Sequence, residues 1–244
     1  MALLQTEGFI LNCKNVGDAD RLITFLSIDQ GMMKLFARNV RRAKSPLSGL
    51  LQPFVHVEIF YTQGKSCSLR QCTMIEPFYL LREDLTIMAY ASVVAELVIQ
   101  FWPEGEGDGG LVEFVAQVFH VIGEKNPRLV ALAASWQLLV MAGFAPELTV
   151  CVHCGNQVAM HDTYLFSPSA GGVCCTKCAT AEAAELPSST FILLKKLITL
   201  DWKHPDSFSV TGSDLMQVEK IFLDYLLCHS DQPLKSLAFI HSIA

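Results

Sequence analysis

Cys151-Val152-His153-Cys154, followed by Cys175-Thr176-Lys177-Cys178, is the stretch that decides the organisation of this chain. Two residues between paired cysteines let both thiolates and the turn's backbone surround one ion, and two such pairs make a tetrahedral zinc site. The intervening segment is expected to form a hairpin, with a strand at Tyr164-Leu165-Phe166 and a turn at Gly171-Gly172. The pattern therefore predicts a zinc finger over residues 148–182, liganded by Cys151, Cys154, Cys175 and Cys178.

Four thiolates fill the shell of a zinc ion, so we expect one structural Zn²⁺ per chain and no catalytic metal. The alternative is a metal-free knuckle with buried thiols. Cys174 is expected to stay outside the shell, because using it would need a less usual three-residue spacer, and His153 is expected to point outward. The other cysteines are expected to be small core or strand residues: Cys13, Cys67, Cys72 and Cys228.

Residues 1–80 show a β pattern, because short apolar runs rich in β-branched residues alternate with turn signals. We expect strands over residues 3–12, 22–28, 32–38, 54–61 and 69–75. A longer link at 39–53 separates the third strand from the fourth. Five short strands with an insertion at this place predict a five-stranded OB-fold barrel, although an SH3-like barrel has a similar pattern.

The pattern becomes helical in residues 81–147 and 183–244, so the finger interrupts an α-helical domain. Helices are expected over residues 84–101, 111–122, 127–143, 191–200 and 213–228. Their expected N-terminal caps include Asp84, Ser188 or Ser189, and Ser213. The fold class is therefore multi-domain α+β: an OB-fold domain (1–80), a helical domain (81–147 and 183–244) and the inserted zinc finger (148–182).

The charge of the 244-residue chain is unevenly distributed. Its net charge is −6, but residues 1–80 hold nine basic and six acidic residues, a charge of +3, and the remainder carries −9. Such an asymmetry indicates domains with different partners. With 51% hydrophobic and 17% charged residues the chain is not disordered. The longest uncharged stretch, residues 129–146, suits a buried helix better than a membrane span, and the N-terminus lacks signal-peptide features, so we expect a cytoplasmic protein without membrane contact.

A basic run lies in the positive domain. Residues 34–44 contain five positive charges and no acidic residue. Alternate residues of a strand share one face, so Lys34, Phe36 and Arg38 are expected on one side of the third strand. OB barrels present this region to single-stranded nucleic acid, whose phosphates bind Lys and Arg. The alternative is an ordinary solvated loop. The candidate nucleic-acid contacts are Lys34, Arg38, Arg41, Arg42 and Lys44.

Two apparent nucleotide motifs fail in their context. Gly64-Lys65-Ser66 resembles the end of a phosphate-binding loop, but Ile59 stands where that loop needs glycine. The glycines of residues 105–110 match a dinucleotide pattern by letter, but they follow a helix and Pro103 instead of a strand. Nothing in the pattern indicates an enzyme.

Together these residues resemble the RecO family of bacterial DNA-repair proteins over almost the whole chain. The resemblance depends on the order and spacing of several segments: Gly31–Arg38, Ser45-x-Leu47-x-Gly49, Gln52-Pro53-Phe54, Leu69-Arg70, Leu138-Leu139, Gly143-Phe144-x-Pro146, Cys151-x-x-Cys154-Gly155, Phe166-Ser167, Gly171-Gly172, Cys175-x-x-Cys178 and Leu234-Lys235-Ser236.

The resemblance implies a recombination mediator that binds single- and double-stranded DNA and anneals complementary strands without hydrolysing nucleotides. It implies contacts with RecR and with the C-terminal tail of single-strand-binding protein. Through these partners the protein would indirectly help to load RecA onto DNA, at the nucleoid during repair. The family's DNA-binding positions correspond to Lys34, Arg38, Arg41 and Arg70, with Arg42 and Lys44 adjoining. One departure is Asn39, where the family commonly has glycine; asparagine tolerates the left-handed conformation, so the turn is expected to survive.

Two other classes of function compete with this one. The first is a zinc-ribbon scaffold or regulator whose barrel binds protein instead of DNA. The second is a hydrolase with a catalytic zinc, which requires an open metal position and a nearby general base.

Overall fold

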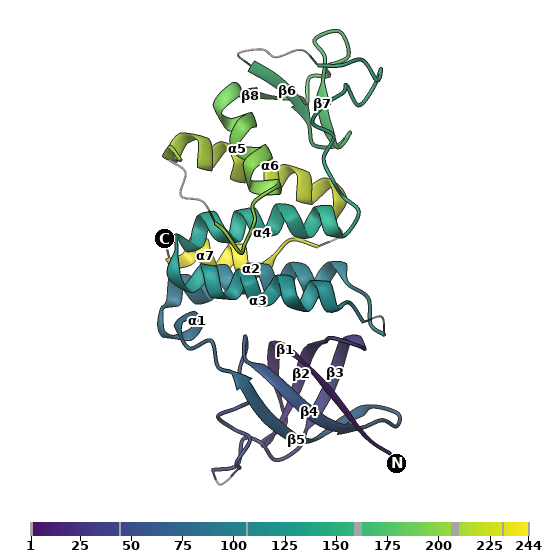
Figure 1. Cartoon of the computed structure of the whole chain (residues 1–244), viewed down its shortest axis with the longest axis vertical. Coiled ribbons are helices and arrows are strands. Elements are labelled where there is room, and N and C mark those ends of the chain that lie inside the picture. Colours follow the sequence, from purple (N-terminus) through teal and green to yellow (C-terminus); the bar gives the residue numbers. More distant parts are fainter. Residues whose placement is uncertain are drawn as a thin grey trace. The chain divides into compact units, whose positions relative to one another are not determined.

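The computed structural model describes residues 2–43, 45–105, 107–158, 163–205, 210–230 and 232–243. Its internal contacts divide the chain into two compact units, whose elements are labelled in Figure 1. The first unit comprises Met1–Pro127 and Lys235–Ala244, and the second comprises Arg128–Leu234. The second unit is therefore inserted into the sequence of the first. The domain boundaries expected from the sequence stay a prediction beside this division.

The first unit begins with a closed barrel of five strands in the order β1-β2-β3-β5-β4. β1 is long enough to pair with β2 along one side and with β4 along the other, and β3 runs parallel to β5. This Greek-key order confirms the OB-like barrel expected from the sequence. The strands are β1 (Leu3–Val16), β2 (Asp20–Ser27), β3 (Gly31–Ala37), β4 (His56–Thr62) and β5 (Cys67–Glu76).

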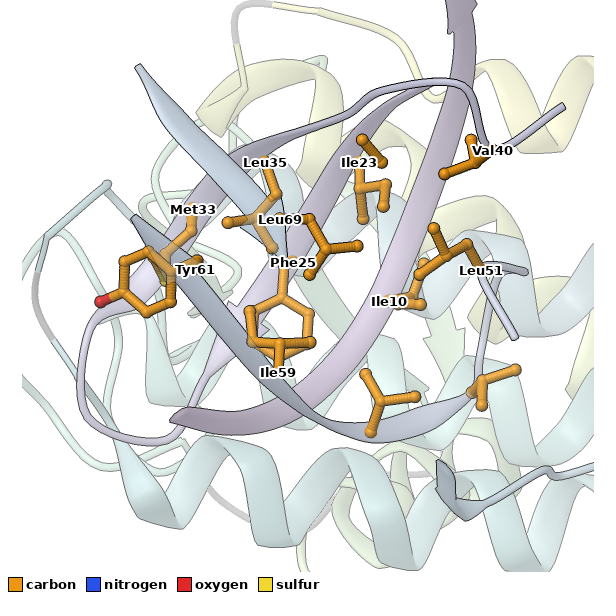
Figure 2. Packing of buried hydrophobic residues seen from close by; sticks show 13 residues of the cluster. Ile10, Ile23, Phe25, Met33, Leu35, Val40, Leu51, Ile59, Tyr61 and Leu69 are labelled. Carbon is orange, nitrogen blue, oxygen red and sulfur yellow. The ribbon is translucent and has the colours of Figure 1, made fainter. Parts of the chain in front are cut away.

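Alternating side chains fill the barrel. Every second residue of β4 is buried, as a strand with one face in a core requires. Val40 and Leu51 join the same cluster from the segment that links β3 to β4. Figure 2 shows these residues meeting inside the barrel: Ile10, Ile23, Phe25, Met33, Leu35, Val40, Leu51, Ile59, Tyr61 and Leu69. Each fully buried side chain of this size contributes about 1.5–3 kcal/mol, so this core holds the outer face of the strands in place.

Four helices complete the first unit: α1 (Leu80–Glu83), α2 (Leu85–Phe101), α3 (Gly109–Glu124) and α7 (Lys235–Ile243). Asp84 caps α2 as expected, since its carboxylate accepts hydrogen bonds from the N–H groups of Thr86 and Ile87. Asp108 caps α3 by accepting from the N–H of Leu111. Helix α7, which packs against α2, was not expected from the sequence.

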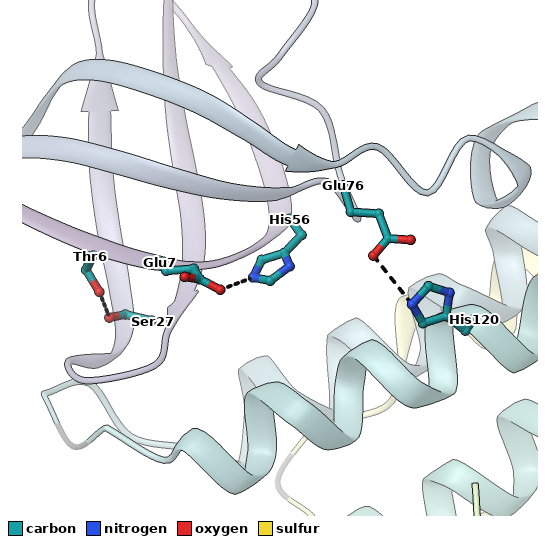
Figure 3. A network of polar contacts seen from close by, with 6 residues as sticks. All are labelled: Thr6, Glu7, Ser27, His56, Glu76 and His120. Atoms are coloured by element: carbon teal, nitrogen blue, oxygen red, sulfur yellow. Dashed lines mark hydrogen bonds and ion pairs between the residues drawn. The ribbon is translucent and has the colours of Figure 1, made fainter. Parts of the chain in front are cut away.

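An aromatic cluster joins α3 to the barrel. The ring of Phe119 makes edge contacts with Phe9 and Phe54 at centroid distances of 5.5 and 5.4 Å. Figure 3 shows polar contacts beside it: His120 of α3 lies 3.4 Å from the carboxylate of Glu76. This mixed contact positions the last residues of β5 against α3.

The second unit combines helices with a small sheet. Its helices are α4 (Pro127–Met141), α5 (Ser188–Ile198) and α6 (Gly212–His229), and its strands are β6 (Thr163–Ser167), β7 (Gly172–Cys174) and β8 (Ala184–Pro187), in the order β7-β6-β8. The expected β6–β7 hairpin is present, and Gly171 has the positive φ of +85° that its turn needs. Trp136 of α4 packs on Phe222 and Tyr225 of α6, with centroids 5.4 Å away.

Two expected caps are wrong. The residue before α5 is Pro187, whose side chain cannot accept a hydrogen bond, and Ser189 instead donates to the carboxylate of Asp214. Thr211, not Ser213, caps α6 by accepting from the N–H of Asp214. The carboxylate of Asp214 accepts hydrogen bonds from the hydroxyls of Ser189, Thr190 and Thr211.

Within the described ranges of the chain, no helix combines the length and the apolar character needed to cross a membrane.

Candidate metal centre and basic barrel face

The first cysteine pair, Cys151 and Cys154, lies in a tight turn that is bonded to the small sheet. The N–H of Gly155 donates to the carbonyl of Cys151 at 2.8 Å, and Gly155 takes a φ of +72°, which glycine adopts without a Cβ penalty. The N–H of Val152 donates to the carbonyl of Val173 at 3.0 Å. This bond ties the first pair to β7, immediately before the second pair.

The second pair closes in a similar way. The N–H groups of Cys178 and Ala179 both donate to the carbonyl of Cys175, each at 3.0 Å. Because β7 ends at Cys174, the hairpin delivers Cys175 to the first pair. The two turns therefore face each other across one small volume.

The four sulfur atoms suit a single metal ion. The Sγ atoms of Cys151, Cys154, Cys175 and Cys178 all lie within 4.8 Å of one another. The Sγ atoms of Cys154 and Cys175 are 3.9 Å apart, close to the edge of about 3.8 Å that a tetrahedron with zinc–sulfur bonds of about 2.3 Å requires. Four soft thiolate donors in this geometry are typical of structural zinc or iron–sulfur sites.

The backbone already favours thiolate at this place. N–H groups of the turns, first that of Cys175, point at the sulfur of Cys151 and lower its pKa from 9.0 to about 6. The neighbouring sulfurs, first Cys175 and then Cys154, hold a proton on Cys178 and raise its pKa to about 12. Metal binding displaces protons from thiols, and the four cysteines lie close enough together to hold one ion.

The remaining cysteines stand apart from the cluster. Cys174 is buried and donates to the carbonyl of Leu165, and burial raises the pKa of its thiol. Cys13, Cys67 and Cys72 pack against the barrel core as expected. Cys228 differs from expectation, since it is exposed on α6. Among the residues that the structure describes, the cluster contains cysteines alone, and His153 is exposed.

The expected basic residues lie on the outside of the barrel. Lys34 is exposed on β3 and Arg38 follows the strand's end, with half-buried Phe36 between them. Their inward-pointing neighbours Leu35 and Ala37 belong to the core. The structure therefore places the two basic side chains on one face, as the alternation predicts. Asn39 has a φ of +58°, so the expected left-handed turn is present.

Arg70 lies on the same outer face. In the parallel ladder Phe36 pairs with Ser68, and two residues further along each strand stand Arg38 and Arg70. Arg70 is exposed, and its Nε donates to the hydroxyl of Thr62 on β4 at 3.1 Å. The paired residues of this ladder are Leu35 with Cys67 and Phe36 with Ser68, so Arg38 and Arg70 both follow its paired end although they are 32 positions apart in the sequence.

The two arginines in the link after β3 have different contacts. Arg41 donates from Nη1 to the carbonyls of Gly17 and Asp18, at 3.1 and 3.2 Å, and so ties the link to the β1–β2 turn. Arg42 is exposed, and its N–H donates to the carbonyl of Asn39. Lys44 lies outside the described residues.

Sequence reasoning missed one residue of this face. The carboxylate of Glu104, from the segment between α2 and α3, lies 2.7 Å from the Nζ of Lys34. A cluster of acidic residues at positions 104–108 was visible in the sequence, but only the fold brings it to β3.

Known sequence families match both parts of the chain. The family described as recombination protein O N terminal matches residues 1–78, and that described as recombination protein O C terminal matches residues 82–238. The chain belongs to the RecO family.

Curated relatives in the RecO family cover the chain from end to end. The DNA repair protein RecO of Symbiobacterium thermophilum is 30% identical over 100% of this chain and 98% of its own length. That of Pelotomaculum thermopropionicum is 30% identical over 98% of this chain and 94% of its own, and that of Moorella thermoacetica is 28% identical over 99% and 91%. The resemblance stated from the motifs is therefore confirmed.

Proposed function

We propose that this chain is a recombination mediator in DNA repair, which binds single- and double-stranded DNA and anneals complementary strands. The observation that carries the proposal is the outer barrel face of a RecO-family protein, where Lys34, Arg38 and Arg70 lie on the parallel strands β3 and β5 or just beyond them. We call these three residues, together with Arg41 and Arg42, the basic face, and we propose Lys44, which lies outside the described residues, as a further phosphate contact.

The basic face supports binding of phosphate backbones. Its described arginines have exposed side chains, so a phosphate reaches them without displacing the core. Arginine and lysine supply affinity by releasing counterions from nucleic acid, independently of base sequence. Half-buried Phe36 lies between Lys34 and Arg38 and offers part of a ring to a base. Screening of two backbones by one positive face lowers their repulsion and lets complementary bases pair.

Zinc has a structural role in this proposal. Four sulfurs would fill all positions of a tetrahedral zinc ion, and among the described residues the cluster contains cysteines alone, so we propose that no position is left for substrate or water. One Zn²⁺ per chain would hold the turns at Cys151 and Cys175 together. We accordingly propose no catalytic step and no nucleotide hydrolysis.

The partners follow from the family. We propose that the chain binds RecR and the C-terminal tail of single-strand-binding protein, the latter through its helices, and so helps load RecA on DNA at the nucleoid. The domains expected from the sequence divide the work: residues 1–80 bind DNA, the helices of 81–147 and 183–244 bind protein, and 148–182 form the zinc finger.

The test is fluorescence anisotropy of a labelled single-stranded oligonucleotide across a salt series. The variant Arg38→Glu/Arg42→Glu/Arg70→Glu leaves Arg41 in place, because the Arg41 side chain holds the link. The matched control Lys125→Glu/Lys195→Glu/Lys220→Glu changes the net charge equally at other elements, and circular dichroism checks the folding of both variants.

Wild type and control are expected to bind with a steep salt dependence. The basic-face variant should bind far more weakly, with a slope of log K against log salt that is smaller by about 2. Equal binding by all three proteins would move the DNA site away from the barrel. Absence of binding at low salt would favour the scaffold alternative, in which the barrel binds protein.

A further inference from the structure

The segment between α2 and α3 is docked on the barrel beside the basic face. Glu104 forms β-bridges with Gly31 and Met32 at the start of β3. Further along, Gly107 lies so close to the β2–β3 turn that a Cβ there would stand 2.4 Å from the backbone carbonyl of Asp29. Backbone contacts thus hold Glu104 and Gly107 against the barrel.

The turn that receives the segment is itself held firmly. The hydroxyls of Thr6 and Ser27 share a hydrogen bond of 2.6 Å, drawn in Figure 3, and both contact the carboxylate of Asp29. The N–H of Gln30 donates to the Ser27 hydroxyl at 3.0 Å. The position of Glu104 relative to β3 is therefore set by the fold.

Its backbone position aims the Glu104 carboxylate at the basic face. Oε1 lies 2.7 Å from Nζ of Lys34, and the two side chains are 61% and 62% exposed. An ion pair so open to water is weak and easily exchanged, because solvent screens it. The carboxylate holds the ammonium group as an oxygen of a nucleic-acid phosphate would.

The charge of Glu104 also acts on β5, the other strand of this face. Burial raises the pKa of the Cys67 thiol, and the Glu104 carboxylate adds to that increase. Cys67 pairs with Leu35, the residue after Lys34, in the parallel ladder. The negative charge of Glu104 thus acts on the part of the basic face around Lys34, away from Arg38.

We propose that Glu104 is a built-in competitor of DNA phosphates at Lys34, and that it limits affinity at this end of the basic face. The proposal deepens the proposed function and rests on it. Binding of a strand exchanges one ion pair for another: the phosphate takes Lys34, and the Glu104 side chain turns into water. The docked backbone stays in place throughout.

Anisotropy titrations of the same labelled single strand test the competitor. Glu104→Gln keeps the size of the side chain and the backbone bridges but removes the charge. Glu124→Gln, an exposed position at the end of α3, is the control with the same change in net charge. Both substitutions are also made in a Lys34→Gln background, where the Glu104 carboxylate has no ammonium group to pair with.

Relative to Glu124→Gln, the Glu104→Gln protein should bind up to about five-fold more tightly at low salt. Its salt slope should be steeper by about 0.7, which corresponds to one further phosphate contact on a single strand. In the Lys34→Gln background the two glutamine variants should bind alike. Equal binding with Lys34 intact would overturn the competitor.

The basic-face variant separates this failure from failure of the proposed function. If it loses binding while Glu104→Gln equals Glu124→Gln, the DNA site stands and the competitor is refuted. If the basic-face variant binds like wild type and the two glutamine variants also agree, both proposals fail. Absence of binding by every protein at low salt has the same meaning.

Discussion

The indole Nε1 of Trp202 donates a buried hydrogen bond of 2.7 Å to Oε1 of Gln137. The amide Nε2 of Gln137 donates to the carbonyls of Leu197 and Leu200, both at 2.9 Å. These partners fix the orientation of the amide, since an indole only donates and a carbonyl only accepts. One side chain of α4 thereby holds the end of α5 and the turn that follows it.

Gln137→Leu is expected to lower the free energy of unfolding by about 3 kcal/mol, because it leaves polar groups buried without this partner. Urea denaturation followed by tryptophan fluorescence measures the loss. Trp202→Phe removes the indole N–H together with part of a buried ring, so it also lowers the free energy of unfolding, and the double variant should be less destabilised than the sum of the two. Additive effects would show that the two side chains act independently.

The carboxylate of Glu96 in α2 anchors the start of α7. It accepts from the N–H groups of Lys235 and Ser236 and from the Ser236 hydroxyl, at 2.9, 2.8 and 2.6 Å. A negative charge at a helix N-terminus is favourable, so Glu96→Gln should destabilise the first unit by about 1–2 kcal/mol. The control Glu124→Gln should change the urea midpoint little, and equal midpoints would contradict the anchoring role.

Metal content gives a direct test of the cysteine cluster. The purified protein should hold one zinc ion, and its cobalt form should show the absorption of a tetrahedral thiolate site. Cys154→Ser should lose the metal and lower the melting temperature, since binding energy here is folding energy. Cys174→Ser, with the neighbouring thiol outside the cluster, should keep both. Loss of metal from Cys174→Ser alone would mean that the second turn uses the other spacing.

His56 should make the first unit sensitive to acid. Its ring stacks on Phe9 with the centroids 4.6 Å apart. Its Nε2 lies 3.0 Å from the Glu7 carboxylate, a contact drawn in Figure 3. Burial lowers the pKa of His56 below its ordinary 6.5, although Glu7 and Glu76 act in the opposite direction. The unfolded chain therefore binds this proton at a higher pH than the folded chain.

It follows that the stability contributed by neutral His56 is fully present above about pH 6.5 and is lost as the pH falls from that value through the lower pKa of the folded protein. His56→Phe keeps the stack without the titrating group, so its urea midpoint should fall less than that of wild type between pH 7.5 and 5.5. The exposed His204→Gln serves as control and should follow wild type. A parallel fall of His56→Phe and wild type would exclude His56 as the acid-sensitive group.

Arg38 and Arg41 should separate DNA affinity from stability. Both are exposed candidates for phosphate contact, but the Arg41 side chain also holds the carbonyls of Gly17 and Asp18. Arg38→Ala is therefore expected to weaken DNA binding with an unchanged melting temperature, whereas Arg41→Ala should reduce both. Calorimetry beside the anisotropy titration distinguishes them, and a stability loss in Arg38→Ala would assign that residue a structural role.

Sequence periodicity predicted the barrel well, because alternation along β3 and β4 follows from burial of one face. The paired cysteines likewise allowed the four-cysteine cluster to be predicted, since the spacing within each pair is a local property. The left-handed turn at Asn39 was also local. Alternation within a strand, the spacing within each cysteine pair and the turn at Asn39 depend on residues close together in the chain, whereas closure of the barrel and the meeting of the two pairs do not.

Other features depend on contacts that no local pattern contains. The cap of α6 is Thr211 and not Ser213 because of where the chain enters the helix, and Ser189 turns to Asp214, 25 positions away. Glu104 meets Lys34 only after the barrel has closed. The start of the short helix α7 is held by Glu96, and no sequence pattern links these two distant parts of the chain.

The inserted position of the second unit has a consequence for synthesis. Glu96 and Ser236, which join α2 to α7, are 140 positions apart. A ribosome therefore makes the barrel and α2 first, then all of the cysteine-bearing unit, and only afterwards the helix that completes the earlier part. Until α7 has been synthesised, the surface of α2 that receives it lacks this partner. The first unit is therefore completed only after all four cysteines of the second unit have been synthesised.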